Sequence, residues 1–311
     1  MTTQTNNAIQ VHDYGDADQL RLEQIPVPEP QEGEVLVRVH AAGVNPMDWK
    51  IRSGAIKNFM PATFPYVPGA DLAGVVAKVG PGVTTFQPSQ DVFGRSSKGS
   101  YAEYAIAPAN TLALKPESLS FDEAATIPVG ATTAWQGLFE HGNLQPGQRV
   151  LILGGAGGVG IYAVQFARWK GAHVISTAST RNVDFVRSLG AETVIDYTQT
   201  QVADAVHDVD LVFDTVGGEA LAGVLPTLKR GGTLVSIAGQ PDEAKAKEQN
   251  VRIARFSAQI STELLTTFAQ LIDEGSVKVF VGPVFSLIEA GKAQELSQSR
   301  HGRGRIILHI A

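Results

Sequence analysis

The chain has 311 residues, more than one ordinary domain needs, and this length predicts two domains. Hydrophobic residues make up 43% and charged residues 18% of the sequence, which is typical of a soluble mixed α/β protein and excludes a coiled coil or a disordered chain. The sequence contains no cysteine, so a disulfide framework, a thiolate zinc site, an iron–sulfur cluster and a cysteine nucleophile are all excluded.

The net charge is −6, from 25 basic and 31 acidic residues without a basic block, and this argues against a nucleic-acid-binding surface. The first ten residues, MTTQTNNAIQ, lack the charged and apolar regions of a secretory signal, so we expect a cytoplasmic protein. Apolar stretches such as 150–153 and 306–308 fall far short of the roughly 20 residues that span a bilayer, and no membrane contact is predicted.

The first third of the chain alternates apolar and polar side chains with a period of two, as in residues 35–40 and 71–79. Prolines and glycines interrupt these runs at short intervals, which indicates many short strands joined by loops. We therefore expect a barrel-like β domain with few helices in this region.

The helical part of the chain begins near residue 120, where Ser120 is followed by the acidic residues Asp122 and Glu123, a combination typical of a helix N-terminus. From Arg149 onward, short apolar strands alternate with helices. We expect strands at 149–153, 172–177, 193–195, 210–214, 232–237 and 251–254, and helices at 158–170, 180–188 and 261–274. Helices between buried strands predict parallel pairing through right-handed crossovers, and hence a doubly wound sheet.

The tail of the chain returns to a β pattern at residues 304–308, which predicts that it rejoins the first domain. The sequence thus predicts an α/β protein in two parts. Residues 1–119 and 278–311 are expected to form the β domain. Residues 120–277 are expected to form an inserted dinucleotide-binding domain, whose sheet the strand at 251–254 and the helix at 261–274 would complete.

A glycine-rich loop follows the strand at 149–153 and opens the next helix. Gly155, Gly157 and Gly160 stand in G-x-G-x-x-G register, and a second strand ends about 20 residues further on. Glycine at such a turn removes the Cβ that would collide with a pyrophosphate, and the N–H groups of the helix start face its negative charge. An ordinary glycine-rich loop is the alternative, but the strand and helix on either side favour a dinucleotide site.

The end of the second strand carries Ser179, Thr180 and Arg181 and no acidic side chain. An acid there would hydrogen-bond the ribose 2′-hydroxyl of NAD(H) and repel a 2′-phosphate, whereas an arginine donates to a phosphate. NADP(H) is therefore the predicted cofactor. The alternative is that Ser179 and Thr180 only cap the next helix and that Arg181 is a solvated charge.

Motifs distributed along the whole chain carry a family resemblance. They are AGVNPMDWK (42–50), VPGADLAG (67–74), GSYAEY (99–104), the glycine loop, SLGA (188–191), DTVGG (214–218) and GRIIL (304–308). Together they resemble the medium-chain dehydrogenase/reductases, and within them the zinc-independent quinone oxidoreductases and their alkenal and enone reductase relatives. The resemblance implies a GroES-like β domain that contacts substrate, a Rossmann domain, and a homodimer formed across the Rossmann sheets.

Alcohol dehydrogenases of the same superfamily hold catalytic zinc with a cysteine where Asn45 stands, a histidine where Ala70 stands, and a second cysteine in the region of 130–133. None of these ligands is present, so no metal is predicted. Without a Lewis acid, alcohol oxidation is not expected. We instead expect hydride transfer from NADPH to an acceptor that is already electrophilic, such as a quinone or an α,β-unsaturated carbonyl.

Asn45 and Lys50 lie in the segment that, by resemblance, faces the nicotinamide, and they are the predicted catalytic residues. Asn45 is expected to donate to the substrate oxygen or to a cofactor hydroxyl. Lys50 is expected to hydrogen-bond an enolate oxygen or relay a proton, with a pKa lowered by desolvation. The alternatives are that Asn45 is a turn residue before Pro46 and that Lys50 is a solvated residue at a strand end. Asp48 is expected to be structural, with proton transfer as its alternative role.

The resemblance assigns Gly157, Gly158 and Val159 to the pyrophosphate, and Ser179 and Tyr197 to the 2′-phosphate region. Many quinone reductases have a lysine where Asn182 stands, so the phosphate cation here would have to be Arg181 or come from elsewhere. The loops after the later strands are expected to approach the nicotinamide half with small side chains. The full predicted cofactor set is Asn45, Thr133, Gly155, Gly157, Gly158, Val159, Gly160, Ser179, Arg181, Tyr197, Val216, Gly217, Ala238 and Gly239.

The leading prediction is an NADPH-dependent reductase of small quinones or enones. An enoyl-thioester reductase is an alternative of the same class, although it would need a long apolar channel and a cationic docking surface. A non-catalytic NADPH-binding structural or sensor protein is the alternative of a different class. The seven histidines show no ligand spacing and no serine lies in a nucleophile elbow, so a metal hydrolase or a serine hydrolase is disfavoured.

Overall fold

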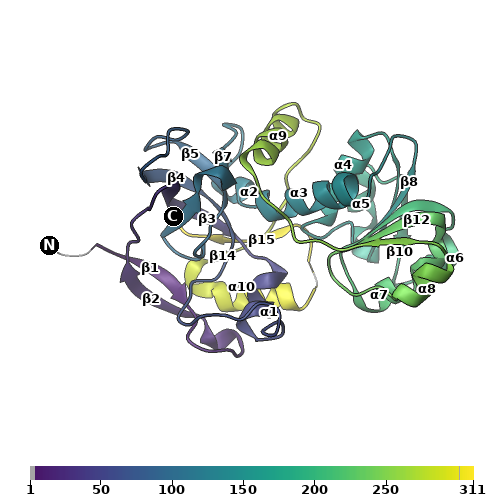
Figure 1. The fold of residues 1–311 in the computed structure, drawn as a ribbon, viewed down its shortest axis with the longest axis horizontal. Helices are drawn as coiled ribbons and strands as arrows, with labels where there is room; N and C mark the ends of the chain where they lie inside the picture. Colours follow the sequence, from purple (N-terminus) through teal and green to yellow (C-terminus); the bar gives the residue numbers. More distant parts are fainter. Residues whose placement is uncertain (1–3, 301) are drawn as a thin grey trace. The chain divides into compact units, whose positions relative to one another are not determined.

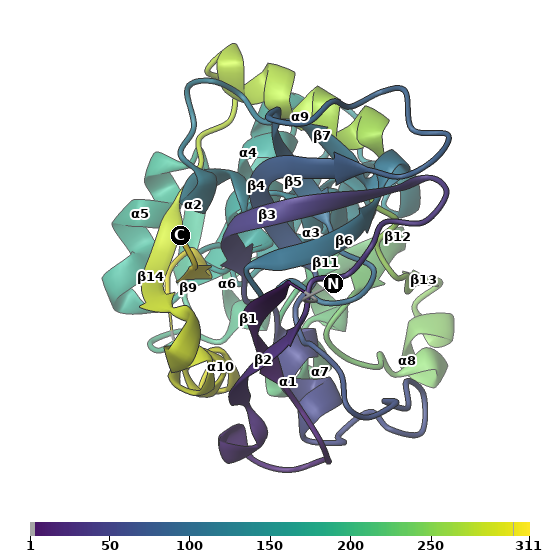
Figure 2. The same cartoon turned by 90° about the vertical axis from the view of Figure 1, so that its left-hand side faces the viewer.

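The structure is a computed structural model that describes residues 4–300 and 302–311 (Figures 1 and 2). The chain forms two compact units. The first unit comprises residues 1–129, 260–274 and 279–311, and the second comprises residues 130–259 and 275–278.

The first unit is built on a seven-stranded sheet. Its strands lie in the order β14-β15-β3-β4-β5-β7, with β6 paired to the other part of β3, and all neighbours are antiparallel except β14 and β15. A two-stranded antiparallel sheet of β1 and β2 accompanies it. The strands are β1 (Thr5–Gln10), β2 (Arg21–Pro26), β3 (Glu34–Gly43), β4 (Asp71–Val79), β5 (Asp91–Arg95), β6 (Tyr104–Pro108), β7 (Leu112–Leu114), β14 (Val281–Ser286) and β15 (Arg305–His309).

The core of this sheet follows from the two-residue period seen in the sequence. Val35, Val37 and Val39 occupy alternate positions of β3, so they share one face, and all three are fully buried with Val76 and Val92 from the neighbouring strands. The helices of the first unit are α1 (Pro46–Arg52), α2 (Phe121–Ala124), α9 (Thr262–Asp273) and α10 (Ala290–Gln298). The prediction of a β domain to which the tail of the chain returns is confirmed.

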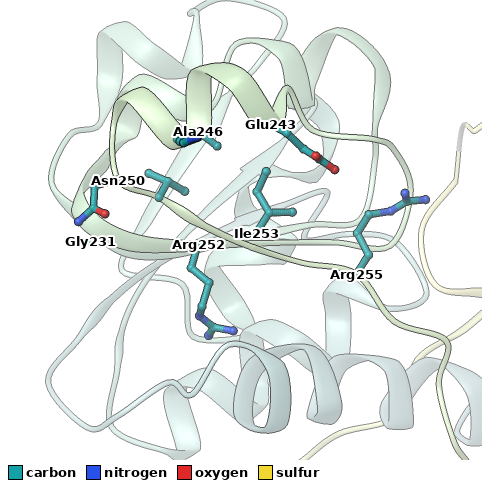
Figure 3. A pocket seen from close by; sticks show the side chains of 9 residues that line it. Gly231, Glu243, Ala246, Asn250, Arg252, Ile253 and Arg255 are labelled. Carbon is teal, nitrogen blue, oxygen red and sulfur yellow. The ribbon is translucent and has the colours of Figure 1, made fainter.

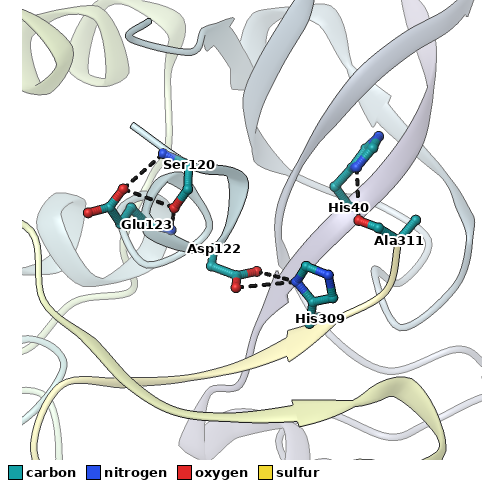
Figure 4. A network of polar contacts seen from close by, with 6 residues as sticks. All are labelled: His40, Ser120, Asp122, Glu123, His309 and Ala311. Atoms are coloured by element: carbon teal, nitrogen blue, oxygen red, sulfur yellow. Dashed lines mark hydrogen bonds and ion pairs between the residues drawn. The ribbon is translucent and has the colours of Figure 1, made fainter. Parts of the chain in front are cut away.

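Polar contacts join the last residues of the chain to β3 and α2 of the first unit, as Figure 4 shows. The Nδ1 atom of His40 on β3 lies 3.0 Å from the carbonyl oxygen of Ala311, and Nδ1 of His309 lies 3.0 Å from a carboxylate oxygen of Asp122 on α2. The Ser120 hydroxyl accepts the first-turn N–H of α2, as the sequence predicts for a helix N-terminus.

The second unit contains a six-stranded, wholly parallel sheet in the order β10-β9-β8-β11-β12-β13. The chain starts at the centre with β8, moves outward in one direction and then outward in the other. Right-handed crossovers therefore place α4 and α5 on one face and α7 and α8 on the other (Figure 1). The predicted doubly wound sheet is confirmed.

The strands of the second unit are β8 (Arg149–Leu153), β9 (His173–Ala178), β10 (Thr193–Asp196), β11 (Val209–Asp214), β12 (Leu228–Ser236) and β13 (Arg252–Ala254). Its helices are α4 (Gly160–Trp169), α5 (Val183–Ser188), α6 (Val202–Ala205), α7 (Gly218–Ala222) and α8 (Glu243–Glu248). Helix α3 (Pro128–Trp135) leads from the first unit into the second and continues as a π-helical stretch at Gln136–His141.

The helix expected over 261–274 is present as α9, but it does not complete the second sheet as predicted. The Thr262 hydroxyl donates to the carbonyl oxygens of Leu112 at 2.8 Å and Ala109 at 3.3 Å, which anchors the helix beside β7 in the first unit. Residues 120–129 also pack with the first unit. The predicted domain limits, 1–119 with 278–311 and 120–277, stay a prediction about functional domains and differ from the compact units in these segments.

Candidate functional site

The glycine loop connects β8 to α4, and its three motif glycines differ in what surrounds them. A Cβ on Gly155 would lie 2.3 Å from Oγ of the buried Ser176, and one on Gly160 would lie 2.1 Å from the carbonyl oxygen of Gly154. A Cβ on Gly157 would meet only that carbonyl oxygen, at 3.4 Å, an ordinary contact. Internal packing therefore requires glycine at the first and third positions of the motif. At the second position the neighbouring atoms leave room for a side chain, so this is the side from which a ligand would approach the loop.

Thr177, at the end of β9, holds this loop in place. Its hydroxyl oxygen accepts the Gly154 N–H at 2.9 Å, and its carbonyl oxygen accepts the Gly155 N–H at 3.0 Å. The partly buried Gly158 and Val159 follow and lead into α4, where the N–H of Ile161 donates to the carbonyl oxygen of Gly157 at 3.0 Å. The pyrophosphate of a dinucleotide fits this arrangement, because the loop offers open space beside Gly157 at the N-terminus of a helix.

The loop after β11 is organised by the fully buried carboxylate of Asp214. One carboxylate oxygen accepts the N–H groups of Val216 at 3.0 Å and Gly217 at 2.8 Å, and the other accepts the hydroxyl of Ser236 at 2.7 Å. Because Ser236 ends β12, one side chain orders the loops after two neighbouring strands.

These loops form a continuous rim along the carboxyl edge of the second sheet. The Thr215 hydroxyl donates to the carbonyl oxygen of Leu153 at 2.7 Å, which joins the loop after β11 to the end of β8. Gly217 has a φ of 73°, and a Cβ there would lie 2.6 Å from the carbonyl oxygen of Ala238. The predicted residues Val216, Gly217, Ala238 and Gly239 thus come together at the edge where ligands of doubly wound sheets bind.

The predicted ribose end of the site lies at the adjacent ends of β9 and β10. Ala178 is in register with Asp196, and the N–H of Tyr197 donates to the carbonyl oxygen of Ala178 at 3.1 Å. This register brings Ser179, Arg181 and the 56% exposed Tyr197 to one corner of the sheet. Thr133, by contrast, is a buried residue of α3.

An acidic residue that sequence reasoning missed lies at the same corner. The Thr180 hydroxyl donates to a carboxylate oxygen of Asp196 at 2.6 Å, and the Thr198 hydroxyl donates to the other oxygen at 2.7 Å. These hydrogen bonds, that of Thr180 first, lower the pKa of Asp196, so the group is ionised at neutral pH. The end of β9 itself carries no acid, as predicted, but its neighbour β10 supplies one.

In the first unit, Asn45 precedes α1 and is only 3% exposed. Its amide nitrogen donates to a carboxylate oxygen of Asp71 at 3.0 Å, and its amide oxygen accepts a hydrogen bond from the guanidinium of Arg305. Its backbone N–H donates to Asp48 at 2.8 Å. Both ends of the Asn45 side chain are therefore engaged within the protein.

The residues around Asn45 form a buried polar network. Asp48, Asp71, Tyr101 and Arg305 are each at most 5% exposed, and the Tyr101 hydroxyl donates to Asp48 at 2.8 Å. Burial raises the pKa of Asp48 to about 7, and burial also raises the pKa of Asp71, against the lowering effect of Arg305. Within residues 4–300 and 302–311, Nε and one terminal nitrogen of Arg305 have no hydrogen-bond partner.

Lys50 lies in the last turn of α1, so the alternative of a strand-end lysine is wrong. Its ammonium nitrogen is 5.7 Å from the centre of the Trp49 ring, within cation–π range. Burial, with a smaller contribution from the nearby Arg300, lowers the pKa of the half-buried Lys50. This is the direction that the sequence analysis expects for a lysine that hydrogen-bonds an oxyanion or relays a proton.

A hollow of about 720 Å³ lies beside α8 and β13 and is shown in Figure 3. Glu243, Asn250, Arg252 and Arg255 are among the residues that line it, and it shares none with the predicted site. A second hollow of about 340 Å³ includes Gly218 and Gln240, which adjoin the loops after β11 and β12.

In the described part of the chain, no group of three or more histidine, aspartate or glutamate side chains is placed to hold a metal ion. His301 lies outside that part. Over the same residues, every helix is too short or too polar to cross a membrane.

Comparison with known proteins places these features in a family. Residues 31–117 match a model described as alcohol dehydrogenase GroES-like domain, and residues 189–308 match one described as zinc-binding dehydrogenase. The NADPH-dependent alkenal/one oxidoreductase of Arabidopsis thaliana chloroplasts is 34% identical over 96% of this chain and 78% of that protein.

Solved structures agree with the sequence comparison. The quinone oxidoreductase from Coxiella burnetii superposes with a TM-score of 0.91 at 34% identity, over 99% of this chain and 100% of that one. The CurK enoyl reductase has the same TM-score at 27% identity, also over 99% and 100% of the two chains.

Proposed function

This chain belongs to the medium-chain dehydrogenase/reductase superfamily, among the quinone oxidoreductases and alkenal/enone reductases, and on that premise we propose that it is an NADPH-dependent, metal-free reductase of quinones or α,β-unsaturated carbonyls. The family supports an oxidoreductase that binds NAD(P)(H). The observation that carries the proposal is the glycine loop, where Gly157 has no packing reason to be glycine and leaves space for a pyrophosphate.

The reduced cofactor, when bound, supplies the hydride. The residues after β8, β11 and β12 would hold the pyrophosphate and the nicotinamide half, in a rim fixed by Thr177 and Asp214. With an enone, the hydride adds to the β-carbon, and negative charge develops on the carbonyl oxygen as the substrate becomes an enolate. A proton from solvent then adds to the α-carbon and gives the ketone. Lys50 would stabilise that oxygen by hydrogen bonding, because its lowered pKa makes it a more ready proton donor than an ordinary lysine.

The preference for NADPH over NADH rests on Arg181 and Tyr197. Both are exposed at the corner where β9 and β10 end, and an arginine there provides donors for a 2′-phosphate. Asn182, which stands where many relatives have a lysine, is buried beside Ser179, and its neutral amide supplies no charge for a phosphate.

The role of Asn45 in this proposal differs from that of Lys50. Its amide is occupied by Asp71 and Arg305, so we propose that it fixes the start of α1 and thereby the helix that carries Lys50. A direct contact to a cofactor hydroxyl would require its amide to exchange one of these partners.

The experiment that tests the proposal measures NADPH oxidation with a panel of acceptors: a para-quinone, an ortho-quinone, an α,β-unsaturated aldehyde and an α,β-unsaturated ketone. Turnover of at least one acceptor is expected, with a lower kcat/KM when NADH replaces NADPH. Binding of NADPH without turnover of any acceptor would instead favour the structural or sensor protein.

An enoyl-thioester reductase is the second candidate, favoured by the likeness to the CurK enoyl reductase. It is distinguished by adding a crotonyl thioester to the same panel, which that enzyme class reduces faster than a free enone of equal length.

We further propose a homodimer formed through the edge of the second sheet. Strand β13 is an end strand of that sheet, and its outer side has no neighbour in the sheet order. Light scattering during size-exclusion chromatography tests this proposal, because a monomer mass at micromolar concentration would contradict it.

A further inference from the structure

The carboxylate of Asp196 lies at the corner of the second sheet where the proposed cofactor's ribose would bind. It ends β10, in register with Ala178 at the end of β9, and it is partly exposed. Ser179 and Arg181, the proposed phosphate-binding residues, flank Thr180, whose hydroxyl contacts Asp196 directly at 2.6 Å. A negative charge therefore stands one residue away from the groups proposed to bind a 2′-phosphate.

The hydrogen bonds of Asp196 also determine what its neighbours are able to donate. The Thr180 hydroxyl proton points to the carboxylate, so it is not available to a phosphate oxygen. Thr198 donates both its hydroxyl, at 2.7 Å, and its N–H, at 3.0 Å, to the other carboxylate oxygen. The charge is thus held in place by three donors rather than free to swing away.

We propose that Asp196 is a specificity-determining residue that restrains the preference for a 2′-phosphorylated cofactor. Arg181 attracts the 2′-phosphate, while Asp196 repels it and withholds the Thr180 hydroxyl. A neutral side chain at 196 removes the repulsion and leaves the attraction. The inference rests on the proposed NADPH preference and names the residue that limits it.

The test compares two fragments that differ only by the phosphate, 2′,5′-ADP and 5′-AMP, in calorimetric titrations of the full chain at low salt. Asp196→Asn keeps the size and one acceptor oxygen but removes the charge. Its Kd for 2′,5′-ADP is expected to fall by about fivefold, and its Kd for 5′-AMP to change by less than about twofold. The gain is expected to shrink at high salt, because salt screens the charge of this partly exposed group.

Two variants serve as controls. Asp208→Asn removes the same charge at the opposite, amino edge of the sheet, just before β11, and its left-handed φ of 56° suits asparagine. Its two dissociation constants are expected to match those of the wild type. Thr180→Val keeps the Asp196 charge and removes the hydroxyl, and is expected to leave the affinity for 2′,5′-ADP at or below that of the wild type.

An unchanged ratio of the two dissociation constants in Asp196→Asn would overturn the inference, and so would an equal shift in Asp208→Asn. The wild-type ratio is a separate result. If the wild-type protein binds 5′-AMP as tightly as 2′,5′-ADP, the proposed NADPH preference fails. The shift in the ratio caused by Asp196→Asn still decides the role of Asp196. Retained 5′-AMP binding in each variant shows that the corner is folded.

Discussion

Replacing Gly157 by alanine separates the proposed cofactor-binding role of the glycine loop from its role in folding. A methyl group at this position meets only the Gly154 carbonyl oxygen, at 3.4 Å, and Gly157 is not among the glycines with a left-handed φ. Replacing Gly160 is the matched comparison, because a methyl group there would lie 2.1 Å from the same oxygen and 2.8 Å from the Gly155 Cα, which are backbone atoms that cannot turn aside.

The magnitudes follow from these contacts. Gly157→Ala is expected to change the free energy of unfolding by no more than about 1 kcal/mol, in the stabilising direction, because alanine loses less backbone entropy on folding. Gly160→Ala is expected to cost about 1–3 kcal/mol or more through overpacking. The methyl at 157 would hold a pyrophosphate away from the N–H groups of α4, and losing one charge-assisted hydrogen bond costs about 1.5–3 kcal/mol, or roughly 10- to 150-fold in Kd.

The assay pairs urea unfolding with a fluorescence titration of NADPH. The urea midpoint of Gly157→Ala should equal that of the wild type or lie slightly above it. The variant should nevertheless bind NADPH at least tenfold more weakly, because one charge-assisted hydrogen bond to the pyrophosphate is lost. Wild-type affinity in Gly157→Ala would refute the reasoning, since the methyl would then not meet a ligand. Equal destabilisation of both variants would refute it on the structural side, since the two sites would then be packed alike.

The remaining predictions concern the first unit. Arg305→Met should lower the free energy of unfolding by about 3–5 kcal/mol in urea, because it removes the cation beside the buried carboxylates. Arg38→Met, at an exposed arginine, should have little effect. Equal effects of the two variants would contradict the ionic role of Arg305. The contribution of Asp48 to the free energy of unfolding should fall as pH rises from about 4 to about 7, by up to about 4 kcal/mol. The folded state keeps the Asp48 proton, with a pKa of about 7, whereas the unfolded state releases it near 3.8. Asp48→Asn should flatten that fall, and an unaltered slope would assign it to other groups. Lys50→Met should lower kcat/KM for an enone by about 10²-fold while leaving the Kd of NADPH within about twofold, and an unchanged kcat/KM would remove Lys50 from the reaction.

Local signals in the sequence were enough to predict the second sheet and its glycine loop. The strand at 149–153, the glycine spacing and the helix that follows lie within about 20 residues, and the chemistry of such a unit depends on neighbours in sequence. The helix over 261–274 was also predicted, because its period is local. Its place beside β7 was not, because the contacts of Thr262 join residues about 150 positions apart.

Two features that the sequence did not reveal depend on strand register: the position of Asp196, and the contacts by which Asp214 orders two loops. Asp196 reaches the corner proposed for the ribose only because β10 pairs with β9 so that Asp196 lies beside Ala178. Asp214 orders two loops only because β12 lies next to β11. A sequence shows that an acid ends a strand, but the neighbour of that strand is set by the whole sheet. Hydroxyls at the ends of adjacent parallel strands are the one signal that would have suggested such contacts.

The buried polar network of the first unit distinguishes the two predicted catalytic residues by the hydrogen-bond donors that each has to offer. Stabilising a developing oxyanion requires N–H donors that are available at the moment of reaction. The Asn45 amide donates to Asp71 and is held by Arg305 from the last strand, 260 residues away in sequence. Lys50 is half-buried, and its ammonium, with three donors, lies near the face of Trp49. We therefore propose different roles for the two residues: Asn45, with Asp48, fixes the start of α1 in the core, and Lys50, one turn further on, donates to an acceptor oxygen.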